Sequence, residues 1–513
     1  MRNEASTTAA PWVKKMKLAG NFIANQWSTP KKGVEFQKEN PAAPSEIIAR
    51  GQWSLEAVGE AVEAAQKAAP AWDRLGTEAR VEYLLKFRSA LEARQEEISA
   101  AISQEMGKVG WEARTEAKAL LAKIDLMTGE GLNFTATVHP EGLTGGYWRR
   151  RPLGVVGVLA PFNFPLHLAN GHIIPALATG NTVVVKPSEE APLSMQLYFQ
   201  CLQEADLPPG VVNMVQGPGE VGAQLVADRR VRGILFTGSY HTGVRIREAT
   251  VRSPGRLLAL EMGGKNTTLV MSDADLEQAA TEILLSSCLT TGQRCSATSR
   301  VVVERAVAQE LKERLKSLFE GITTGAPQED VFMGPLASAK GYQSFLKAQG
   351  NDEGGKLRSL LEGGAFEDRK GYFVRPSLWE ALEFDPSGPH QSEELFGPDV
   401  VIYDVDNQKE AIQVANGTEY GLAMSVFTTH RERFLDMSYE LETGILNWNR
   451  STVGASSRLP FGGVKQSGNH RPAAILAGEY CTFPQATLEV EPGFDEKAFQ
   501  SGPLSYLKLA SRD

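Results

Sequence analysis

Short apolar runs alternate with amphipathic helical runs through the middle of this chain, and this rhythm constrains its fold more than any other feature. Five runs rich in valine, leucine and isoleucine are predicted to be buried strands, at 155–159, 182–185, 211–215, 233–236 and 257–260. Helical spacing fills the stretches between them, at 167–178, 193–204, 221–227 and 242–252. This alternation predicts parallel βαβ units in a doubly wound sheet. Ligands of such sheets bind at the carboxyl ends of the strands, so the loops there are the first candidates for a site.

A second alternating series begins near residue 265. Its predicted strands are 266–270, 300–303, 400–403, 423–427 and 444–447, and its predicted helices include 276–289 and 307–319. A length of 513 residues is ample for two or three domains, and this series predicts a second α/β domain. The stretch 350–364 is rich in glycine and charge, which predicts a loop.

Composition disfavours several classes of function. The formal net charge of −9 argues against a nucleic-acid surface. No apolar run reaches the roughly 18 residues of a membrane span, and residues 1–29 lack a signal-peptide pattern. The four cysteines show no CxxC spacing and the seven histidines no metal-binding pair, so neither a disulfide framework nor a metal site is expected. We expect a soluble, cytoplasmic protein that binds no nucleic acid, membrane or metal.

One cysteine and one glutamate could carry nucleophilic chemistry. Cys295 follows a Gly-Gln-Arg turn after an apolar helical run, and Glu261 lies upstream before a Met-Gly-Gly-Lys segment. A cysteine thiolate attacks an acyl carbon, and a carboxylate takes a proton from the thiol or from water. A cysteine in an apolar segment is more often a small buried hydrophobe, so the flanking motifs decide between the two interpretations.

Two glycine-rich loops and a charged loop could bind a nucleotide. Residues 217–222 match G-x-G-x-x-G, and residues 236–243 form a second loop between strand and helix. Helix N-termini supply free N–H groups for phosphate, although either loop could simply be a tight turn. Lys186 and Glu189 follow a strand and could bind ribose hydroxyls, where the carboxylate would repel a 2′-phosphate and favour NAD over NADP. The alternative is an exposed charged loop.

An asparagine stands among aromatic residues and prolines at 161–165. The amide of Asn163 could donate to an oxyanion formed at an attacked carbonyl. Alternatively, it could fix its own turn.

Together these segments resemble the aldehyde dehydrogenase superfamily. The matching segments run in the family's order, at 161–165, 186–189, 236–243, 261–265 and 292–295, followed by 394–398 and 460–463. The resemblance covers roughly residues 18 to 490. Within the superfamily, the segments 168–177, 447–449, 454–457 and 467–472 resemble the N-succinylglutamate 5-semialdehyde dehydrogenases of arginine catabolism. Phe162 and Met262 depart from the common tryptophan and leucine, and both changes keep an apolar side chain.

The resemblance implies a domain organisation and a role for each matching residue. It implies a Rossmann-type NAD-binding domain (1–140 and 158–264), a second α/β catalytic domain (265–465) and an oligomerisation arm (141–157 and 478–495). Cys295 would be the nucleophile, Glu261 the general base and Asn163 an oxyanion donor. The implied contacts of NAD are Lys186 and Glu189 at the adenosine ribose, Gly219 near the adenine, Gly238, Ser239, Tyr240, His241, Thr242 and Gly243 at the pyrophosphate, Glu394 at the nicotinamide ribose, and Phe396 beside the nicotinamide ring.

The implied reaction is NAD-dependent oxidation of N-succinylglutamate 5-semialdehyde to N-succinylglutamate, through a thiohemiacetal and a thioester on the cysteine. Because that substrate carries two carboxylates, its pocket should offer arginine or several donors. The candidates in matching motifs are Arg294, Arg450, Arg458 and Arg471. The alternatives are a dehydrogenase for another semialdehyde, a coenzyme A-acylating relative, a cysteine hydrolase without a redox step, and a non-catalytic protein. A homodimer or homotetramer is expected.

Overall fold

The computed structural model describes residues 17–493 and Tyr506. Its first sheet has seven strands in the order β10-β9-β6-β7-β8-β1-β2. Five of them are parallel: β6 (Val155–Leu159), β7 (Thr182–Lys186), β8 (Val212–Met214), β9 (Val231–Thr237) and β10 (Leu257–Glu261). The antiparallel strands β1 (Asn21–Ile23) and β2 (Gln26–Ser28) extend one edge. The predicted doubly wound sheet is confirmed, and its strand order reverses between β6 and β9.

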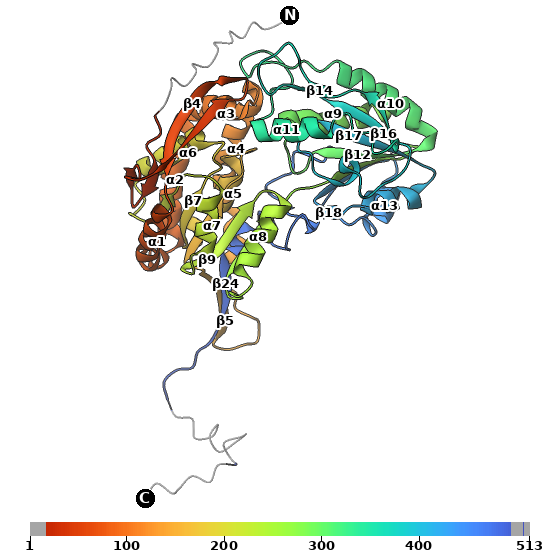
Figure 1. Ribbon diagram of the computed structural model, residues 1–513. Coiled ribbons are helices and arrows are strands. Elements are labelled where there is room, and N and C mark those ends of the chain that lie inside the picture. The colour runs from red at the N-terminus through yellow and green to blue at the C-terminus, as the bar shows by residue number, and fades with distance from the viewer. Residues whose placement is uncertain (1–16, 494–505, 507–513) are drawn as a thin grey trace, which may run out of the picture.

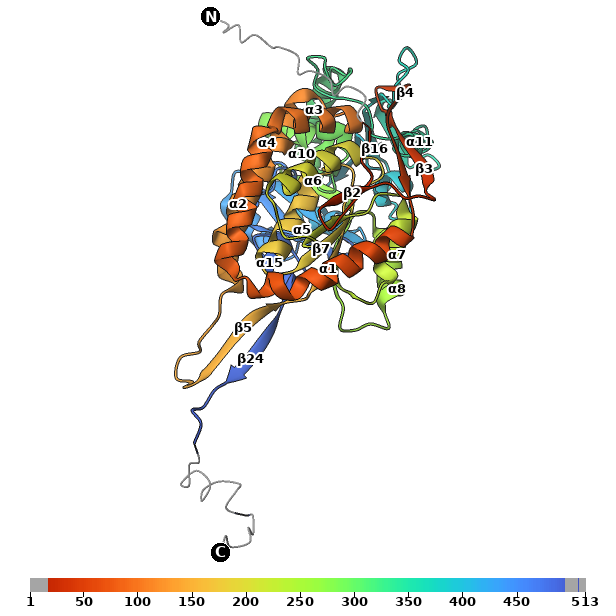
Figure 2. The same ribbon diagram turned by 90° about the vertical axis from the view of Figure 1, so that its left-hand side faces the viewer.

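Helices cover both faces of this sheet. One face packs on α1 (Glu56–Arg74), α7 (Gly219–Ala227) and α8 (Tyr240–Thr250). The other packs on α2 (Thr77–Ala93), α3 (Gln95–Met106), α4 (Gly110–Thr128), α5 (His167–Ala178) and α6 (Pro192–Glu204), which form one side of the molecule in Figure 2. Side chains of β6 alternate between the two cores, since Val156 and Val158 join the second core while Val155 and Leu159 join the first. Burial on both faces explains the continuous apolar runs in the sequence.

The second sheet also has seven strands, in the order β13-β16-β17-β12-β11-β19-β20. Its parallel strands are β11 (Asn266–Val270), β12 (Thr298–Glu304), β16 (Ser377–Ala381), β17 (Asp399–Val405), β19 (Ala423–Phe427) and β20 (Ile445–Trp448). Helices α9 (Leu276–Cys288) and α10 (Arg305–Glu320) cover one face, and α13 (Gln408–Asn416) and α14 (Arg431–Ser438) the other. The two sheets with their helices form two halves that lie side by side (Figure 1).

The prediction of a loop throughout 350–364 was wrong in part. Residues Leu357–Leu361 form β13, an antiparallel edge strand paired with β16. Leu357 is buried and packs in the same core as Trp379, and this contact outweighs the glycines on either side of the strand.

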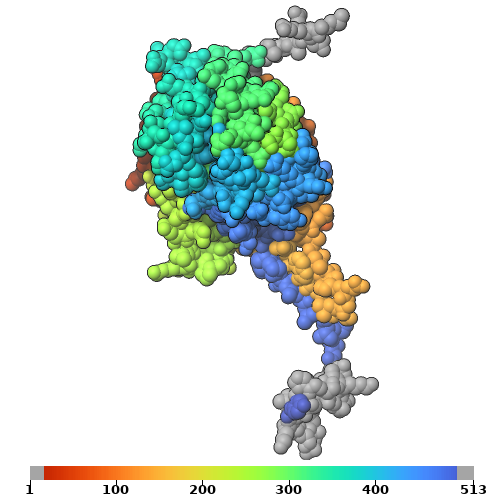
Figure 3. All heavy atoms as spheres, turned by 90° about the vertical axis from the view of Figure 1, so that its right-hand side faces the viewer, coloured from red at the N-terminus to blue at the C-terminus, as the bar shows by residue number. Residues whose placement is uncertain are grey.

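A two-stranded ribbon projects from the body. Strand β5 (Gly146–Pro152) pairs antiparallel with β24 (Thr482–Leu488), and the ribbon extends well beyond both halves (Figures 2 and 3). The predicted arm ran to residue 495, and its last two residues lie outside the described part of the chain.

The remaining elements are small or peripheral. They are the ribbon β3 (Val34–Asn40) and β4 (Ala43–Trp53), the helices α11 (Ala339–Ala348), α12 (Pro389–Ser392) and α15 (Ala477–Tyr480), the 3-10 turns η1 (Glu130–Thr135) and η2 (Leu289–Gly292), and the short strands β14 (Gly364–Ala365), β15 (Val374–Arg375), β18 (Tyr420–Gly421), β21 (Pro460–Phe461), β22 (Val464–Lys465) and β23 (Ala473–Ala474). Within residues 17–493, every helix is too short or too polar to cross a bilayer.

Candidate active site

The candidate site lies where the two halves meet. The first sheet contributes the carboxyl ends of its strands, because Asn163 follows β6, Gly238 follows β9 and Glu261 ends β10. The second sheet contributes the amino ends, because Cys295 lies just before β12 and Phe396 just before β17. Side chains from both halves therefore meet at one place.

The backbone that leads to the cysteine is strained. Thr290 and Thr291 have φ angles of 56° and 55°, in the left-handed region that β-branched residues disfavour, at a cost of about 1–2 kcal/mol each. Gly292 follows with φ of 70°, and a Cβ there would overlap the backbone of Gly397. The strain is held from outside, since Glu112 Oε1 accepts hydrogen bonds from the Thr290 backbone N–H and hydroxyl, both at 2.9 Å. Strained backbone of this kind is typical of functional sites.

Two asparagines fix the backbone of residues 290–297, the cysteine loop. Asn163 is buried and donates from Nδ2 to the carbonyl oxygen of Gln293 at 3.0 Å. Its amide nitrogen carries two hydrogens, so one remains to bind another acceptor. Asn266 donates to the carbonyl oxygens of Cys295 at 2.7 Å and Ala297 at 2.9 Å. Sequence reasoning missed Asn266, although a buried asparagine opening an apolar strand was a usable signal.

The surroundings raise the proton affinity of both the thiol and the glutamate. Burial, helped by the nearby carboxyls of Glu394 and Glu261, raises the pKa of the Cys295 thiol to about 12. Burial also raises the pKa of Glu261 well above its ordinary value, and a hydrogen bond from the backbone of Ala473 opposes only part of this rise. Among the described residues, Glu261 Oε2 has no hydrogen-bond partner. A buried carboxyl of high proton affinity close to a thiol is suited to general base catalysis.

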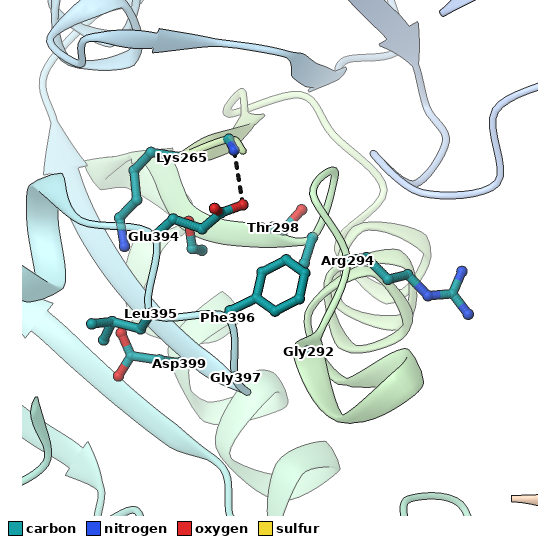
Figure 4. Close-up of a pocket in the computed structure, with 12 residues that line it drawn as sticks. Lys265, Gly292, Arg294, Thr298, Glu394, Leu395, Phe396, Gly397 and Asp399 are labelled. Carbon is teal, nitrogen blue, oxygen red and sulfur yellow. Dashed lines mark hydrogen bonds between the residues drawn. The ribbon is translucent and has the colours of Figure 1, made fainter. Parts of the chain in front are cut away.

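Glu394 and Phe396 line a pocket beside the cysteine loop. Glu394 Oε1 accepts a hydrogen bond of 2.9 Å from the backbone N–H of Gly264 (Figure 4), and burial raises its pKa to about 7. A Cβ at Gly263 would overlap the Glu394 carboxyl, so this approach requires glycine. The ring of Phe396 meets Phe162 from the other half edge to face, with ring centres 5.7 Å apart.

The loop between β9 and α8 presents the start of a helix. Ser239 caps α8, and its side chain accepts a hydrogen bond from the Thr242 backbone N–H. A Cβ at Gly238 would meet the Phe236 ring, and one at Gly243 would overlap the side chain that Met262 packs there. The glycines therefore allow tight packing behind the loop, while the free N–H groups of the first helical turn can bind an anion.

The other predicted cofactor residues lie along the same edge of the first sheet. Lys186 ends β7, and its Nζ lies 2.9 Å from Glu189 Oε2. Gly219 begins α7, and no described atom lies within 4 Å of a Cβ built on it. The edge thus combines a free helix start, an open glycine and a charged pair. These groups fit the phosphates and ribose hydroxyls of a dinucleotide.

Two of the four candidate arginines have carboxylate partners. Arg294 Nη2 lies 3.0 Å from Glu112 Oε1, its guanidinium covers the Phe164 ring, and it points away from Glu394 and Phe396 in Figure 4. Arg458 pairs with exposed Glu130.

The other two arginines are exposed to solvent. Arg450 is bound through its backbone, whose carbonyl oxygen accepts from the Ser425 hydroxyl. Arg471 donates to the carbonyl oxygen of His470 and lines a cavity that also reaches Glu261. No set of three or more histidine, cysteine or carboxylate side chains is grouped to hold a metal ion in the described part.

Comparison with known proteins identifies the class that this fold and site define. The model of the aldehyde dehydrogenase family matches residues 27–484. The chain belongs to this family, so it is an oxidoreductase of the aldehyde dehydrogenase type rather than a hydrolase without a redox step.

Particular relatives lie close to the chain. It is 38% identical, over 486 residues, to an N-succinylglutamate 5-semialdehyde dehydrogenase of Caulobacter sp. (strain K31), covering 92% of this chain and 96% of that protein. It is also 38% identical, over 460 residues, to an alpha-ketoglutaric semialdehyde dehydrogenase of Bacillus subtilis (strain 168), covering 88% and 93%. Among solved structures, 1-pyrroline-5-carboxylate dehydrogenase from Thermus with bound NAD matches with a TM-score of 0.87 at 32% identity, covering 92% of each chain. The resemblance inferred from the motifs is confirmed.

Proposed function

We propose that this chain oxidises an aldehyde to a carboxylic acid with NAD, using Cys295 as nucleophile, Glu261 as general base and Asn163 as oxyanion donor. The observation that carries the proposal is the hydrogen bond from Asn163 Nδ2 to Gln293 O, because it holds an amide donor against the cysteine loop. The buried Glu261 with its unpaired oxygen supports the assignment of the base within the described structure.

The chemistry follows from these groups. The Cys295 thiol passes its proton to the Glu261 carboxylate, which releases it to solvent, and Sγ bonds to the aldehyde carbon to form a thiohemiacetal. Asn163 Nδ2 and the Cys295 backbone N–H stabilise its oxyanion, a contribution worth about a hundredfold or more in rate per donor. NAD, held by the residues described below, would supply the acceptor for the hydride that leaves this carbon, so that the carbonyl would reform as a thioester. Glu261 then takes a proton from water, the water oxygen attacks the thioester, and the acid leaves as the thiol is restored.

The cofactor would be held by both halves. Lys186 and Glu189 would bind the adenosine ribose, with Gly219 near the adenine. The loop 238–243 would bind the pyrophosphate, because its helix start offers free N–H groups. Glu394 would bind the nicotinamide ribose, and Phe396 would lie beside the ring. The carboxylate of Glu189 supports NAD over NADP by repulsion of a 2′-phosphate.

The proposed substrate is N-succinylglutamate 5-semialdehyde, supported by the Caulobacter relative and by the motifs that resemble this group. A second candidate is alpha-ketoglutaric semialdehyde, because the Bacillus subtilis relative is as similar in sequence identity. Each substrate carries its aldehyde at one end and at least one carboxylate at the other.

The test is NADH formation with an aldehyde panel. The panel holds the two candidate semialdehydes, succinate semialdehyde, glutamate semialdehyde and a neutral aliphatic aldehyde, each with NAD and with NADP. A strong preference for the succinylated substrate with NAD, lost in Cys295→Ala, is the expected result. Preference for another aldehyde would reject the proposed substrate but leave the proposed reaction standing. Activity that appears only with coenzyme A would indicate an acylating enzyme.

The ribbon of β5 and β24 supports a homodimer or homotetramer. An isolated two-stranded ribbon is marginally stable in water. This one exposes Phe483 and Leu488, with Val490 beyond it 93% exposed. Pairing with a second copy would bury these apolar groups, so sedimentation at micromolar concentration should give a dimer or larger, and a monomer would refute the proposal. The four free cysteines favour a cytoplasmic location, which cell fractionation would test.

A further inference from the structure

Among the described residues, Lys123 and Lys265 are buried lysines without a carboxylate partner, and only Lys123 also has no nearby carboxylate that raises its pKa. Lys38, Lys108, Lys186 and Lys312 are all buried, and each has a carboxylate oxygen within 2.9 Å of its Nζ. Lys123 is only 5% exposed, yet it makes no hydrogen bond or ion pair with any residue in the described part of the chain. Burial lowers its pKa to about 8, and no neighbouring carboxylate opposes this shift. A buried charge without a partner is costly, which suggests that the partner is a ligand.

The space beside Lys123 is kept open by a glycine. Lys123 lies on α4 and faces Gly171 in the middle of α5, where a Cβ would lie 3.8 Å from Nζ. Glycine inside a helix costs about 0.5–1 kcal/mol relative to alanine, so its presence here calls for a reason. Any side chain longer than that of alanine would crowd the ammonium group. The absence of a side chain at Gly171 therefore leaves the Lys123 ammonium group uncrowded on the side that faces α5.

Aromatic contacts connect this position to the cysteine. The guanidinium of Arg294, which directly precedes Cys295, lies 5.0 Å from the centre of the Phe164 ring. Phe164 in turn lies 6.5 Å from the His167 ring, edge to face. Gly171 follows His167 by four residues, so it lies on the same face of α5, about 6 Å further along the helix.

The other titratable groups near Lys123 do not compete for an anion. Burial, together with the charge of Lys123, lowers the pKa of His167 and of His172 to about 3, so both rings are neutral. Lys108 is bound to Glu116 at 2.6 Å. In the described structure, His167 Nδ1 is buried and has no hydrogen-bond partner. Lys123 thus supplies an unpaired positive charge, and His167, one helical turn before Gly171 on α5, supplies an unsatisfied ring nitrogen.

We propose that Lys123 is a specificity-determining residue that binds a carboxylate at the end of the substrate remote from the aldehyde. With the aldehyde carbon at Cys295, the substrate chain would run past Phe164 and His167, and its carboxylate would meet Nζ beside Gly171. The partner that Lys123 lacks in the protein would then be the substrate itself. This proposal rests on the proposed aldehyde oxidation and holds for any aldehyde with such a carboxylate.

The experiment compares N-succinylglutamate 5-semialdehyde with its neutral dimethyl ester in four proteins. They are the unaltered enzyme, Lys123→Met, Lys123→Arg and Lys118→Met, the last being an exposed lysine on the same helix. For Lys123→Met we expect KM for the acid to rise about 30-fold or more, since one partner of a buried charge pair is removed. The kcat for the acid and both constants for the ester should change less than about threefold. Lys123→Arg should retain part of the preference for the acid, and Lys118→Met should behave as the unaltered enzyme.

A pH profile separates charge from packing. Because the pKa of Lys123 is about 8, KM of the unaltered enzyme for the acid should rise above that pH as the ammonium deprotonates. Lys123→Arg should lack this rise, because guanidinium stays protonated. Equal effects of Lys123→Met on acid and ester, or a flat pH profile in the unaltered enzyme, would overturn the assignment.

Two further results distinguish this proposal from the proposed function. If the enzyme prefers another carboxylate-bearing aldehyde, the proposed substrate is wrong. The same comparison, made with that aldehyde and its ester, then tests Lys123. If it oxidises neutral aldehydes alone, the role of Lys123 is overturned while aldehyde oxidation stands. Folding is checked by thermal unfolding, where Lys123→Met should be at least as stable as the unaltered enzyme because it removes a buried unpaired charge.

Discussion

The two sheets take part in the site with opposite ends of their strands. The first sheet offers carboxyl ends, where β6, β7, β8 and β9 each run through a short loop into a helix such as α8. The second offers amino ends, where a loop such as 290–295 descends into β12. The loop into α8 is held by glycines and a serine cap. The loop into β12 is held by buried side chains from distant parts of the chain.

This difference matches two different tasks. Helix starts point free N–H groups outward, which suits a large ligand that must enter and leave. A nucleophile needs precise placement, and hydrogen bonds from Glu112, Asn163 and Asn266 provide it for the cysteine loop. Substitutions in the cysteine loop should therefore lower stability and kcat strongly. Substitutions in the loops of the first sheet should have small effects, mainly on the affinity for the cofactor.

The largest effect is expected for Glu112→Ala. Glu112 is buried, and its Oε1 accepts from Thr290 twice and from Arg294. Removal of its carboxylate leaves the partly buried Arg294 guanidinium and the Thr290 backbone N–H without this acceptor. We therefore expect the free energy of unfolding to fall by about 3–5 kcal/mol. Denaturant unfolding measures it. The control is Glu130→Ala, which breaks an exposed ion pair with Arg458 and should cost less than about 1 kcal/mol. Equal denaturation midpoints for the two variants would show that the buried carboxylate of Glu112 stabilises the protein no more than the exposed one of Glu130.

Asn163→Ala should have the next largest effect. It removes both the anchor of the cysteine loop and the proposed oxyanion donor, so kcat should fall about a hundredfold or more, as for other donors of this kind. Initial rates of NADH formation measure the change. Asn181→Ala is the matched control, because Asn181 is equally buried but binds Gly154 and Cys481 at the base of the arm. A similar fall in kcat for both variants would show a general loss of structure instead.

Alkylation of Cys295 should depend steeply on pH. Burial raises its pKa to about 12, so the reactive thiolate is scarce at neutral pH and grows as pH rises. In cofactor-free protein, the rate of iodoacetamide labelling should increase about tenfold per pH unit between pH 7 and 9. Peptide mass spectrometry follows the labelled residue. A rate already constant at neutral pH would mean that the resting cysteine is a thiolate.

The smallest effect is expected for Gly219→Ala in the first half. No described atom lies within 4 Å of the new methyl group, and the residue begins a helix, so stability should change by less than about 1 kcal/mol. A change in KM for NAD with constant kcat would place Gly219 at the cofactor. Gly292→Ala is the counterpart in the cysteine loop and should disrupt folding, because its Cβ would overlap Gly397. A Gly292→Ala variant as stable as Gly219→Ala would contradict the proposed difference between the cysteine loop and the loops of the first sheet.

The sequence predicted both sheets because parallel strands buried on two faces leave continuous apolar runs. It missed β13, whose five residues lie between glycine-rich segments and depend on packing against β16. Cys295, Glu261 and Asn163 could be singled out because each stands within a recognisable motif.

The supports of the cysteine loop could not be predicted in the same way. Glu112 is 178 positions from Thr290, and nothing local indicates that they meet. The left-handed conformation of two threonines contradicts their local preference, so only the folded surroundings explain it. Lys123 has the same character, because only its burial without a partner distinguishes it from other helical lysines.

The distant supports of the cysteine loop also bear on the order of events during synthesis. Glu112 is made before the loop, but Gly334, which accepts from the Thr291 hydroxyl, and Gly397, which lies against Gly292, are made long after it. On the ribosome, the segment around Cys295 therefore emerges before its shape can be completed. A chain that ends before residue 334 would contain the nucleophile but lack two of the backbone segments that shape its loop.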